Sequence, residues 1–298
     1  MRREMLDGVF APMVTPFGED DGVLLPGVAE NVEKMNATGL RGYFALGTNG
    51  EFKALTVEER LAVLRTVIAH RAKDKVVMAG CGAESTKETI ELARRMADLG
   101  ADLVSLLMPC FFPKKMTVDV MERHAVAVAD ASPVPVVLYN NPSVAAGVTI
   151  RLELLQRLAQ HPNIVGVKDS SKETYGENLK AASDKFSVLA GSAAYFVDLL
   201  RRGGTGGVLS LANVFPAECS ALYRAFVERR ASEVEKLNQQ LVDLNTRVSG
   251  SFGVAGVKAA MTLRGFVGGV PRRPYASLSA KEVEILRADL GRSGLDVR

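Results

Sequence analysis

The sequence predicts a (β/α)8 barrel of the TIM type, followed by a C-terminal helical appendage. Short apolar runs alternate with longer stretches of helical spacing, and eight such pairs follow one another within about the first 230 residues. The apolar runs are nearly continuous, as is typical of strands covered on both faces of a sheet. A doubly wound open sheet is the alternative, because closure of the sheet cannot be read from periodicity.

Each predicted element follows from its local pattern. Apolar runs predict strands at residues 8–14, 42–46, 75–79, 102–107, 135–139, 163–167, 186–189 and 207–211. Helical spacing predicts helices at residues 26–38, 57–71, 86–99, 118–131, 152–159, 173–183, 194–202 and 216–229. Two of these helices begin with a capping-box pattern, Thr56 with Glu59 and Ser85 with Glu88.

The strand pattern stops near residue 231. Helical spacing continues over residues 232–247 and 254–263, and Ser279 with Glu282 forms a third capping-box pattern. No low-complexity linker separates this part from the barrel. We therefore predict a catalytic barrel domain at residues 1–230 and a helical region at residues 231–298.

Composition excludes several classes of function. The 298 residues are 47% hydrophobic, enough for a large core. Lys plus Arg (37) nearly balance Asp plus Glu (34), which argues against nucleic-acid and membrane partners. The N-terminus lacks a signal-peptide pattern, and no apolar run reaches the roughly 18–20 residues of a membrane span. The cysteines, Cys81, Cys110 and Cys219, are odd in number and widely spaced, so we expect a soluble, cytoplasmic protein without a disulfide framework.

Active sites of such barrels lie at the carboxyl ends of the strands, where Lys168 is the most informative residue. It directly follows the apolar run at residues 164–167. A lysine there is commonly just the first solvated residue after a buried strand. The functional interpretation is a desolvated amine with a lowered pKa, free to act as a nucleophile. Such an amine attacks a ketone carbon to form an iminium, which accepts electrons when a C–C bond breaks.

Other strand ends carry further candidates. Tyr139 is either a tyrosine satisfied by local hydrogen bonds or a proton shuttle beside an iminium. Residues 47–51 (Gly-Thr-Asn-Gly-Glu) form either a plain turn or a nest of backbone N–H groups that binds a carboxylate. No P-loop pattern follows them. Ser210 stands at the end of the eighth strand, and Cys110, after the fourth, either lines the pocket or is a buried structural thiol.

Metal and dinucleotide sites are not indicated. The three histidines, His70, His124 and His161, have no partner at a metal-ligand spacing and are interpreted as helix-surface or loop residues. The glycine-rich residues 203–207 precede a strand, which favours tight-turn packing over a dinucleotide fingerprint. No cofactor is expected.

The ordered set G-T-N-G-E, Y-N-x-P and V-K-D-S resembles the dihydrodipicolinate synthase / N-acetylneuraminate lyase family over essentially the whole chain. The resemblance implies a class I aldolase barrel, commonly a homotetramer, without a metal or organic cofactor. It implies that Lys168 is the Schiff-base lysine, that Tyr139 relays protons and that the Thr48 hydroxyl links this relay. It also implies that residues 47–49 bind the carboxylate of pyruvate, through the backbone amides of Thr48 and Asn49.

The nearest branch resembles 4-hydroxy-2-oxoglutarate aldolase, for which Asn49 is typical. Two positions depart from family patterns. Dihydrodipicolinate synthases have an arginine for the aldehyde's carboxylate where this chain has Val144, and most members have a tyrosine, given to a neighbouring subunit's relay, at Phe111. Loss of a charged hydrogen bond, worth about 1.5–3 kcal/mol, counts against aspartate semialdehyde as substrate.

These features predict reversible cleavage of a 4-hydroxy-2-oxo acid, such as 4-hydroxy-2-oxoglutarate, to pyruvate and an aldehyde. Alternatives with the same lysine chemistry are dihydrodipicolinate synthase and an aldolase or dehydratase of 2-keto-3-deoxy sugar acids. A 2-oxo-acid sensor without turnover is the alternative from another class. We expect substrate choice to depend on Ser210, on residues 110–115, which include Phe111, and on residues 141–146, which include Val144.

Overall fold

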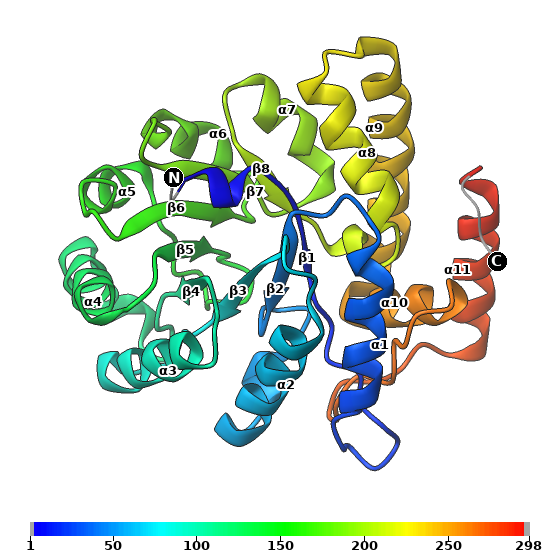
Figure 1. Cartoon of the computed structure of the whole chain (residues 1–298), viewed down its shortest axis with the longest axis horizontal. Coiled ribbons are helices and arrows are strands. Elements are labelled where there is room, and N and C mark those ends of the chain that lie inside the picture. Colours follow the sequence, from blue (N-terminus) through cyan, green and yellow to red (C-terminus); the bar gives the residue numbers. More distant parts are fainter. Residues whose placement is uncertain (1–2, 295–298) are drawn as a thin grey trace.

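A computed structural model describes residues 3–294 as a closed parallel barrel with surrounding helices (Figure 1). The strands follow one another around the barrel in sequence order: β1 (Gly8–Pro12), β2 (Gly42–Ala45), β3 (Val76–Gly80), β4 (Leu103–Leu107), β5 (Val136–Asn140), β6 (Ile164–Asp169), β7 (Ser187–Ala190) and β8 (Gly206–Val208). The predicted fold class is therefore confirmed, and the open-sheet alternative is wrong.

Closure of the barrel depends on close backbone approach between β1 and β8. Gly8 pairs with Gly206, and a Cβ on Gly206 would lie 2.2 Å from the carbonyl oxygen of Gly8. Only glycine fits there. Gly203, at φ +95°, forms the turn before β8, so the glycine-rich segment at residues 203–207 is used for packing, as predicted.

Helices α1 to α7 connect successive strands, and α8 follows β8: α1 (Leu25–Asn36), α2 (Val57–His70), α3 (Thr86–Asp98), α4 (Val118–Ala131), α5 (Leu152–Leu158), α6 (Tyr175–Asn178), α7 (Phe196–Arg201) and α8 (Pro216–Val227). The capping box of Thr56 and Glu59 forms in full. Ser85 caps α3 by accepting a hydrogen bond from the Glu88 backbone. The described helices include none with the length and apolar character needed to span a membrane.

Several predicted bounds differ from the structure. The helix expected at 173–183 is only the short α6, continued by a 3₁₀ turn at Leu179–Ala181, because Thr174 and Asn178 bind the buried carboxylate of Asp169. The strand expected at 207–211 ends at Val208, and a 3₁₀ turn at Ser210–Asn213 follows. His124 is buried and bonds to Thr86 at 2.9 Å, so its interpretation as a surface or loop residue is wrong.

The C-terminal region consists of α9 (Ala231–Asn245), α10 (Ser251–Leu263) and α11 (Ala280–Arg292). A π-helical turn at Thr246–Gly250 joins α9 to α10, and Gly253 has non-helical backbone angles inside α10. This kink explains why the helical pattern restarts near residue 254. The capping box of Ser279 and Glu282 begins α11.

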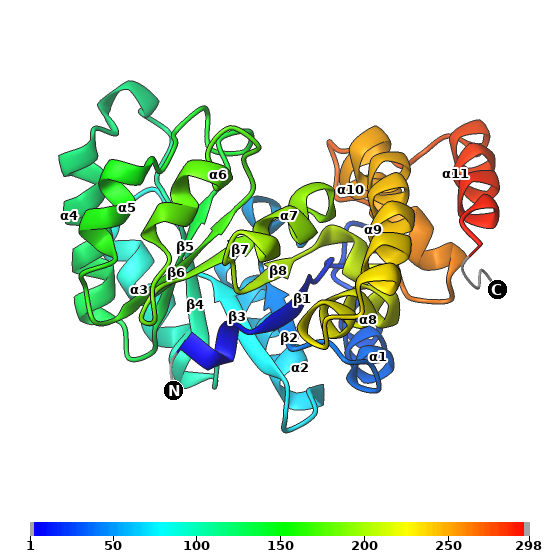
Figure 2. The ribbon, with the colours of Figure 1, turned by 90° about the horizontal axis from the view of Figure 1, so that it is seen from above.

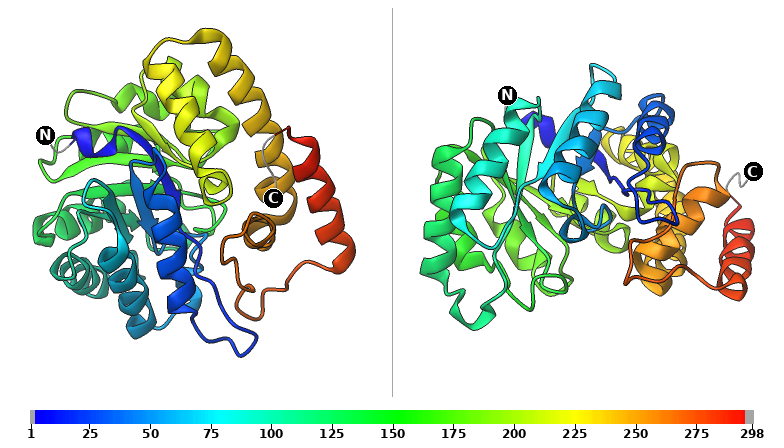
Figure 3. Two further views of the ribbon diagram at one scale, coloured as in Figure 1. Left: turned by 45° about the vertical axis from the view of Figure 1, so that its right-hand side comes forward. Right: turned by 90° about the horizontal axis from the view of Figure 1, so that it is seen from below.

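This region lies along one side of the barrel, at the opposite end of the molecule from α4 (Figures 1 and 2). Helix α9 packs against α8, and α11 packs on the outside of α10 (Figure 3). Asn31 of α1 exchanges two hydrogen bonds of 2.8 Å with the backbone of Val267. Apolar residues of α9 and α10, such as Leu241, Leu244 and Met261, belong to the same buried cluster as the barrel strands. The C-terminal region therefore shares a core with the barrel.

Candidate active site

A cavity of about 380 Å³ opens at the carboxyl ends of the strands. Strand ends from β2, β5, β6, β7 and β8 contribute most of its walls, and the C-terminal region contributes the rest. The lining residues are Thr48, Asn49, Tyr139, Asn141, Ser143, Val144, Lys168, Ser170, Gly191, Ser192, Ser210, Asn245, Ser249, Gly250, Gly253 and Val254. Lys168, Tyr139, Thr48, Asn49, Ser210 and Val144 therefore meet in one cavity.

Lys168 lies inside β6, because this strand continues to Asp169 and does not end at Val167 as expected. Its neighbour across the β5–β6 pairing is Tyr139. The side chain is only 4% exposed, and its Nζ lies 4.0 Å from the centroid of the Tyr139 ring and 4.8 Å from that of Phe44. Lys168 is thus a buried amine facing aromatic rings, and the solvated alternative is wrong.

The Tyr139 hydroxyl belongs to a chain of hydrogen bonds along one wall. It lies 3.0 Å from the Thr48 hydroxyl and accepts a hydrogen bond of 2.9 Å from Asn141 Nδ2. Ser143 donates in turn to Asn141 Oδ1 at 2.7 Å. The Tyr139 ring also packs edge-on against Phe44, with centroids 5.9 Å apart. These contacts hold the phenol hydroxyl beside the amine.

Burial and proximity shift the pKa values of both groups. Burial lowers the pKa of Lys168 below the usual lysine range, and the nearby Tyr139 only partly opposes this shift. Burial alone would raise the pKa of Tyr139. The charge of Lys168 and the hydrogen bonds from Thr48 and Asn141 outweigh burial, so the pKa of Tyr139 is lowered. The pair is therefore suited to proton exchange, because each group shifts toward neutral pH.

A buried network behind Lys168 fixes the ends of β5 and β6. The Asp169 carboxylate accepts hydrogen bonds from Asn140 Nδ2 (3.0 Å), Asn178 Nδ2 (2.7 Å), Thr174 Oγ1 and the Ser171 backbone. Burial raises the pKa of Asp169, and these hydrogen bonds oppose the rise. Asn140 and Asp169 belong to the Y-N-x-P and V-K-D-S motifs, so one hydrogen bond joins the two motifs. Sequence reasoning had not assigned either residue a role.

The turn at residues 47–51 has two backbone amides free for a ligand. Gly50 and Glu51 donate their N–H groups within the turn, to Gly47 and Thr48 carbonyl oxygens. In the described part of the chain, the N–H groups of Thr48 and Asn49 have no acceptor. The Asn49 side chain exchanges hydrogen bonds with Ser210 at 3.0 and 3.2 Å. Two adjacent free donors match the needs of a carboxylate.

Two predicted binding residues do not line this cavity. A Cβ on Gly47 would lie 2.7 Å from the Phe44 ring, so this glycine allows the ring to approach. Phe111 is 75% exposed and packs edge-on against Phe112. Their roles in binding stay predictions. Cys110 is buried outside the cavity, where its Sγ lies 3.1 Å from Lys53 Nζ.

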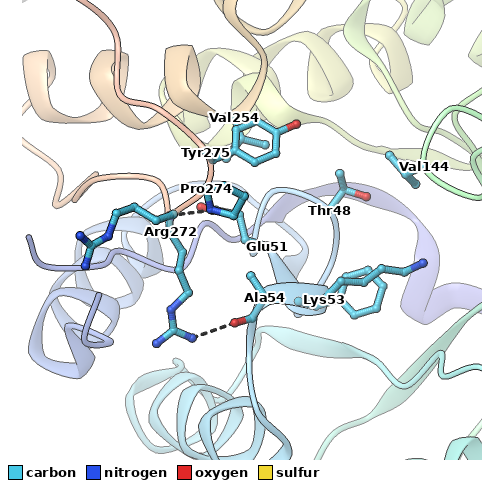
Figure 4. Close-up of a pocket in the computed structure, with 11 residues that line it drawn as sticks. Thr48, Glu51, Lys53, Ala54, Val144, Val254, Arg272, Pro274 and Tyr275 are labelled. Carbon is cyan, nitrogen blue, oxygen red and sulfur yellow. Dashed lines mark hydrogen bonds between the residues drawn. The ribbon is translucent and has the colours of Figure 1, made fainter. Parts of the chain in front are cut away.

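A second cavity adjoins the first and shares Thr48, Val144 and Val254 with it. Residues 272–275 form its far wall, and Lys53 and Ala54 lie below Thr48 in the view of Figure 4. Arg272 is committed to other groups here. Its guanidinium donates to Glu59 at 2.6 Å and to the Ala54 carbonyl oxygen at 2.8 Å, and its backbone N–H donates to Glu51.

Sequence reasoning missed the lining residues Asn245 and Ser249, which lie on helical segments of the C-terminal region. The predicted site consists of residues at strand ends, and neither residue lies near one in sequence. The four-residue spacing that places both side chains on one helical face is the signal that was available.

Comparison with known proteins extends over both parts of the chain. The dihydrodipicolinate synthetase family model matches residues 5–292. An uncharacterised DapA-like lyase from Thermococcus onnurineus is 35% identical over 281 residues, covering 90% of this chain and 92% of the relative. A probable mitochondrial 4-hydroxy-2-oxoglutarate aldolase from Emericella nidulans is 32% identical over 294 residues, covering 96% and 94%.

A solved structure shows the same similarity in three dimensions. The dihydrodipicolinate synthase from Acinetobacter baumannii, complexed with pyruvate, superposes with a TM-score of 0.90 at 30% identity. The match covers 98% of this chain and 100% of that one. The likeness therefore includes the C-terminal region as well as the barrel.

Proposed function

This chain belongs to the dihydrodipicolinate synthetase family and is a lyase of the class I aldolase type, and on that premise we propose that it reversibly cleaves a 4-hydroxy-2-oxo acid to pyruvate and an aldehyde. The observation that carries the proposal is the buried Lys168 amine, 4.0 Å from the Tyr139 ring, in a cavity with free backbone amides. A relative is named as a probable aldolase of 4-hydroxy-2-oxoglutarate, which is one member of this substrate class.

The reaction begins when Lys168 attacks the C2 ketone and loses water from the adduct to give an iminium. The Thr48 and Asn49 amides hold the C1 carboxylate. Tyr139, linked to Thr48 at 3.0 Å, takes the proton of the C4 hydroxyl. The C3–C4 bond then breaks, its electron pair moves toward the iminium nitrogen, and C4 leaves as an aldehyde. Protonation of the enamine at C3 and hydrolysis release pyruvate and the amine.

A second candidate is synthesis of the dihydrodipicolinate skeleton, since the Acinetobacter relative carries that activity in its name. Val144 disfavours it. This side chain lines the cavity at the position where synthases have an arginine for a carboxylate. Assays of pyruvate condensation with aspartate semialdehyde, alongside cleavage of 4-hydroxy-2-oxo acids, separate the two activities.

The first test is trapping with sodium borohydride in the presence of pyruvate, followed by intact-mass and peptide mass spectrometry. We expect one reduced adduct, located on Lys168, because a deprotonated buried amine forms the iminium readily. Lys168→Ala should give no adduct and no cleavage. Lys172→Ala, a change at an exposed lysine four residues away, is the matched control and should behave like wild type. Trapping at another lysine, or cleavage by Lys168→Ala at the wild-type rate, would refute the mechanism.

A further inference from the structure

Three polar side chains form a second wall of the cavity, apart from the chain that includes Tyr139. Ser192 follows β7, Asn245 ends α9, and Ser249 lies in the π-helical turn. Asn245 Nδ2 lies 3.4 Å from Ser192 Oγ, and Ser249 donates to the Asn245 oxygens Oδ1 at 3.1 Å and O at 3.2 Å. Asn245 is only 9% exposed, so its contacts keep the cluster in place. We call Ser192, Asn245 and Ser249 the distal wall.

Within the described chain, the hydrogen bonds of the distal wall leave two donors and one acceptor for a ligand, because the second N–H of Asn245 Nδ2 is also unused. Ser192 Oγ already accepts from Asn245 Nδ2 and from the Ala194 backbone at 3.2 Å, so its hydroxyl proton is free to donate. Ser249 directs its proton at Asn245, so its oxygen is free to accept. Hydroxyl groups donate as well as accept, so they can satisfy all three. A carboxylate accepts only, so it could use the two donors but would leave the Ser249 oxygen without a proton.

The charges around the cavity also disfavour an anion at this end. Among its lining residues in the described chain, only Tyr139 and Lys168 are ionisable, and both belong to the reaction centre. The cations of the adjoining cavity all have carboxylate partners: Arg272 pairs with Glu59, Arg273 with Asp21 and Lys53 with Glu84. In Figure 4 the Arg272 side chain extends toward Ala54 and away from Thr48. A second carboxylate would thus be desolvated without a cation.

The backbone of the C-terminal region leaves room beside the distal wall. Gly253 adopts φ 56° and ψ −143°, and a Cβ placed on it would meet no atom within 4 Å. Gly250 and Gly253 both line the cavity. Space lined by hydroxyls, an amide and glycines suits an extended polar ligand.

We propose that the distal wall binds hydroxyl groups of the aldehyde half of the substrate, so that the preferred 4-hydroxy-2-oxo acid is a neutral-tailed 2-oxo-3-deoxy sugar acid and not a dicarboxylate. This inference rests on the proposed function and specifies its substrate class. Ser192, Asn245 and Ser249 act in binding, and the C3–C4 cleavage described above is unchanged.

Three substrates differing only beyond C4 test the preference in wild-type enzyme. They are 2-keto-3-deoxygluconate with a hydroxylated tail, 4-hydroxy-2-oxoglutarate with a carboxylate, and 4-hydroxy-2-oxopentanoate with a methyl group. Pyruvate release, coupled to lactate dehydrogenase, gives kcat/KM for each. We expect kcat/KM for the hydroxylated substrate to exceed that for each of the others about tenfold or more. One or two net hydrogen bonds to the substrate contribute about that factor. Equal values, or preference for the dicarboxylate, would overturn the proposal.

Variants then locate the preference. Asn245→Ala and Ser249→Ala should each lower kcat/KM for 2-keto-3-deoxygluconate about tenfold, and leave the value for 4-hydroxy-2-oxopentanoate within about twofold. Ser251→Ala, at an exposed serine next to the π-helical turn and outside the cavity, is the matched control. Equal losses of kcat/KM on both substrates would mean that Asn245 and Ser249 have only a structural role. That result would contradict their proposed role in binding the hydroxylated tail.

The borohydride adduct distinguishes failure of this proposal from failure of the proposed cleavage reaction on which it rests. If the Lys168 adduct forms normally but the enzyme shows no preference among the three substrates, only the proposed role of the distal wall in binding hydroxyl groups is refuted. No adduct with pyruvate or with any of the three substrates refutes both proposals.

Discussion

At the scale of single residues, the environment of Lys168 determines what its amine can do. Side chains of β2 and β5, Phe44 and Tyr139, exclude water from Nζ, and burial lowers the pKa. The same desolvation that frees the nucleophile has a cost for folding, because the unfolded chain solvates this lysine fully. Function and stability therefore have opposing requirements at this position.

This opposition predicts that Lys168→Met increases stability. Below the ordinary lysine pKa of about 10.4, the unfolded lysine is protonated while folded Lys168 holds its proton less tightly, so unfolding takes up protons. Wild-type stability should therefore rise as pH increases from neutral toward 10, and this contribution should be absent in the variant. We expect Lys168→Met to raise the free energy of unfolding at pH 7 by at least about 1 kcal/mol. The difference in stability between the variant and wild type should become smaller by about pH 9–10.

Urea unfolding at pH 7 and pH 9 measures both quantities. Lys172→Met is the control, since an exposed lysine has no desolvation to relieve. A variant less stable than wild type at pH 7 would show that the contacts of Lys168 with the aromatic rings outweigh its burial.

At the scale of elements, a buried ion pair joins the turn after β2 to α10. Lys258 is 1% exposed, and its Nζ lies 2.5 Å from Glu51 Oε1 and 2.7 Å from the Val270 carbonyl oxygen. Burial lowers the pKa of Lys258, and Glu51 opposes the shift. Glu51 also accepts from the Arg272 backbone and has a left-handed backbone, at φ 51°. The C-terminal region therefore holds the turn that carries Thr48 and Asn49.

We predict that breaking this pair is costly and that removing both charges restores much of the loss. Glu51→Gln and Lys258→Met should each destabilise the fold by about 3–5 kcal/mol, because each leaves an unpaired buried charge. The double variant should be less destabilised than the sum of the two. Glu59→Gln, which breaks the more exposed pair with Arg272, is a comparison in the same region.

Chemical denaturation of wild type, the two single variants at Glu51 and Lys258, and the double variant gives the coupling energy between the two residues directly. Additive losses would mean that Glu51 and Lys258 stabilise the chain independently. The pyruvate adduct adds a second readout, since a displaced turn should weaken pyruvate binding even in a variant that stays folded.

At the scale of the whole molecule, the boundary predicted at residue 230 divides a shared core. Leu241, Leu244 and Met261 of the C-terminal region are fully buried in the cluster that includes the strands. The same region supplies Asn245 and Ser249 to the cavity. The division into two domains stays a prediction, and these contacts favour one cooperative unit.

We therefore expect a chain of residues 1–230 not to fold by itself. Removing the C-terminal region exposes the apolar faces that α9 and α10 cover, and opens one wall of the cavity. Far-ultraviolet circular dichroism during urea titration should show no cooperative transition for this fragment, and borohydride should trap no pyruvate. The full chain should unfold in one transition by circular dichroism and by tyrosine fluorescence. A fragment that unfolds cooperatively would support two independent domains.

The sequence determined the fold class and the reaction centre because both depend on local order. Alternating apolar runs and helical spacing predicted the eight strands, and any barrel with these strands brings its carboxyl ends together. Lys168, Tyr139 and Thr48 each stand at such an end, so their meeting followed from the topology. The segments that departed from prediction, such as α6, are those where side chains bind a distant group, here Asp169.

Only the tertiary structure decided how exposed Lys168 is and what lines the far side of the cavity. Burial of an amine depends on rings from β2 and β5, which lie tens of residues away in sequence. Asn245 and Ser249 belong to helical segments far from any strand end in sequence, and their place beside Ser192 depends on how α9 packs against α8 and the barrel. Such packing is set by the summed contacts of a whole apolar face, which no local sequence pattern specifies.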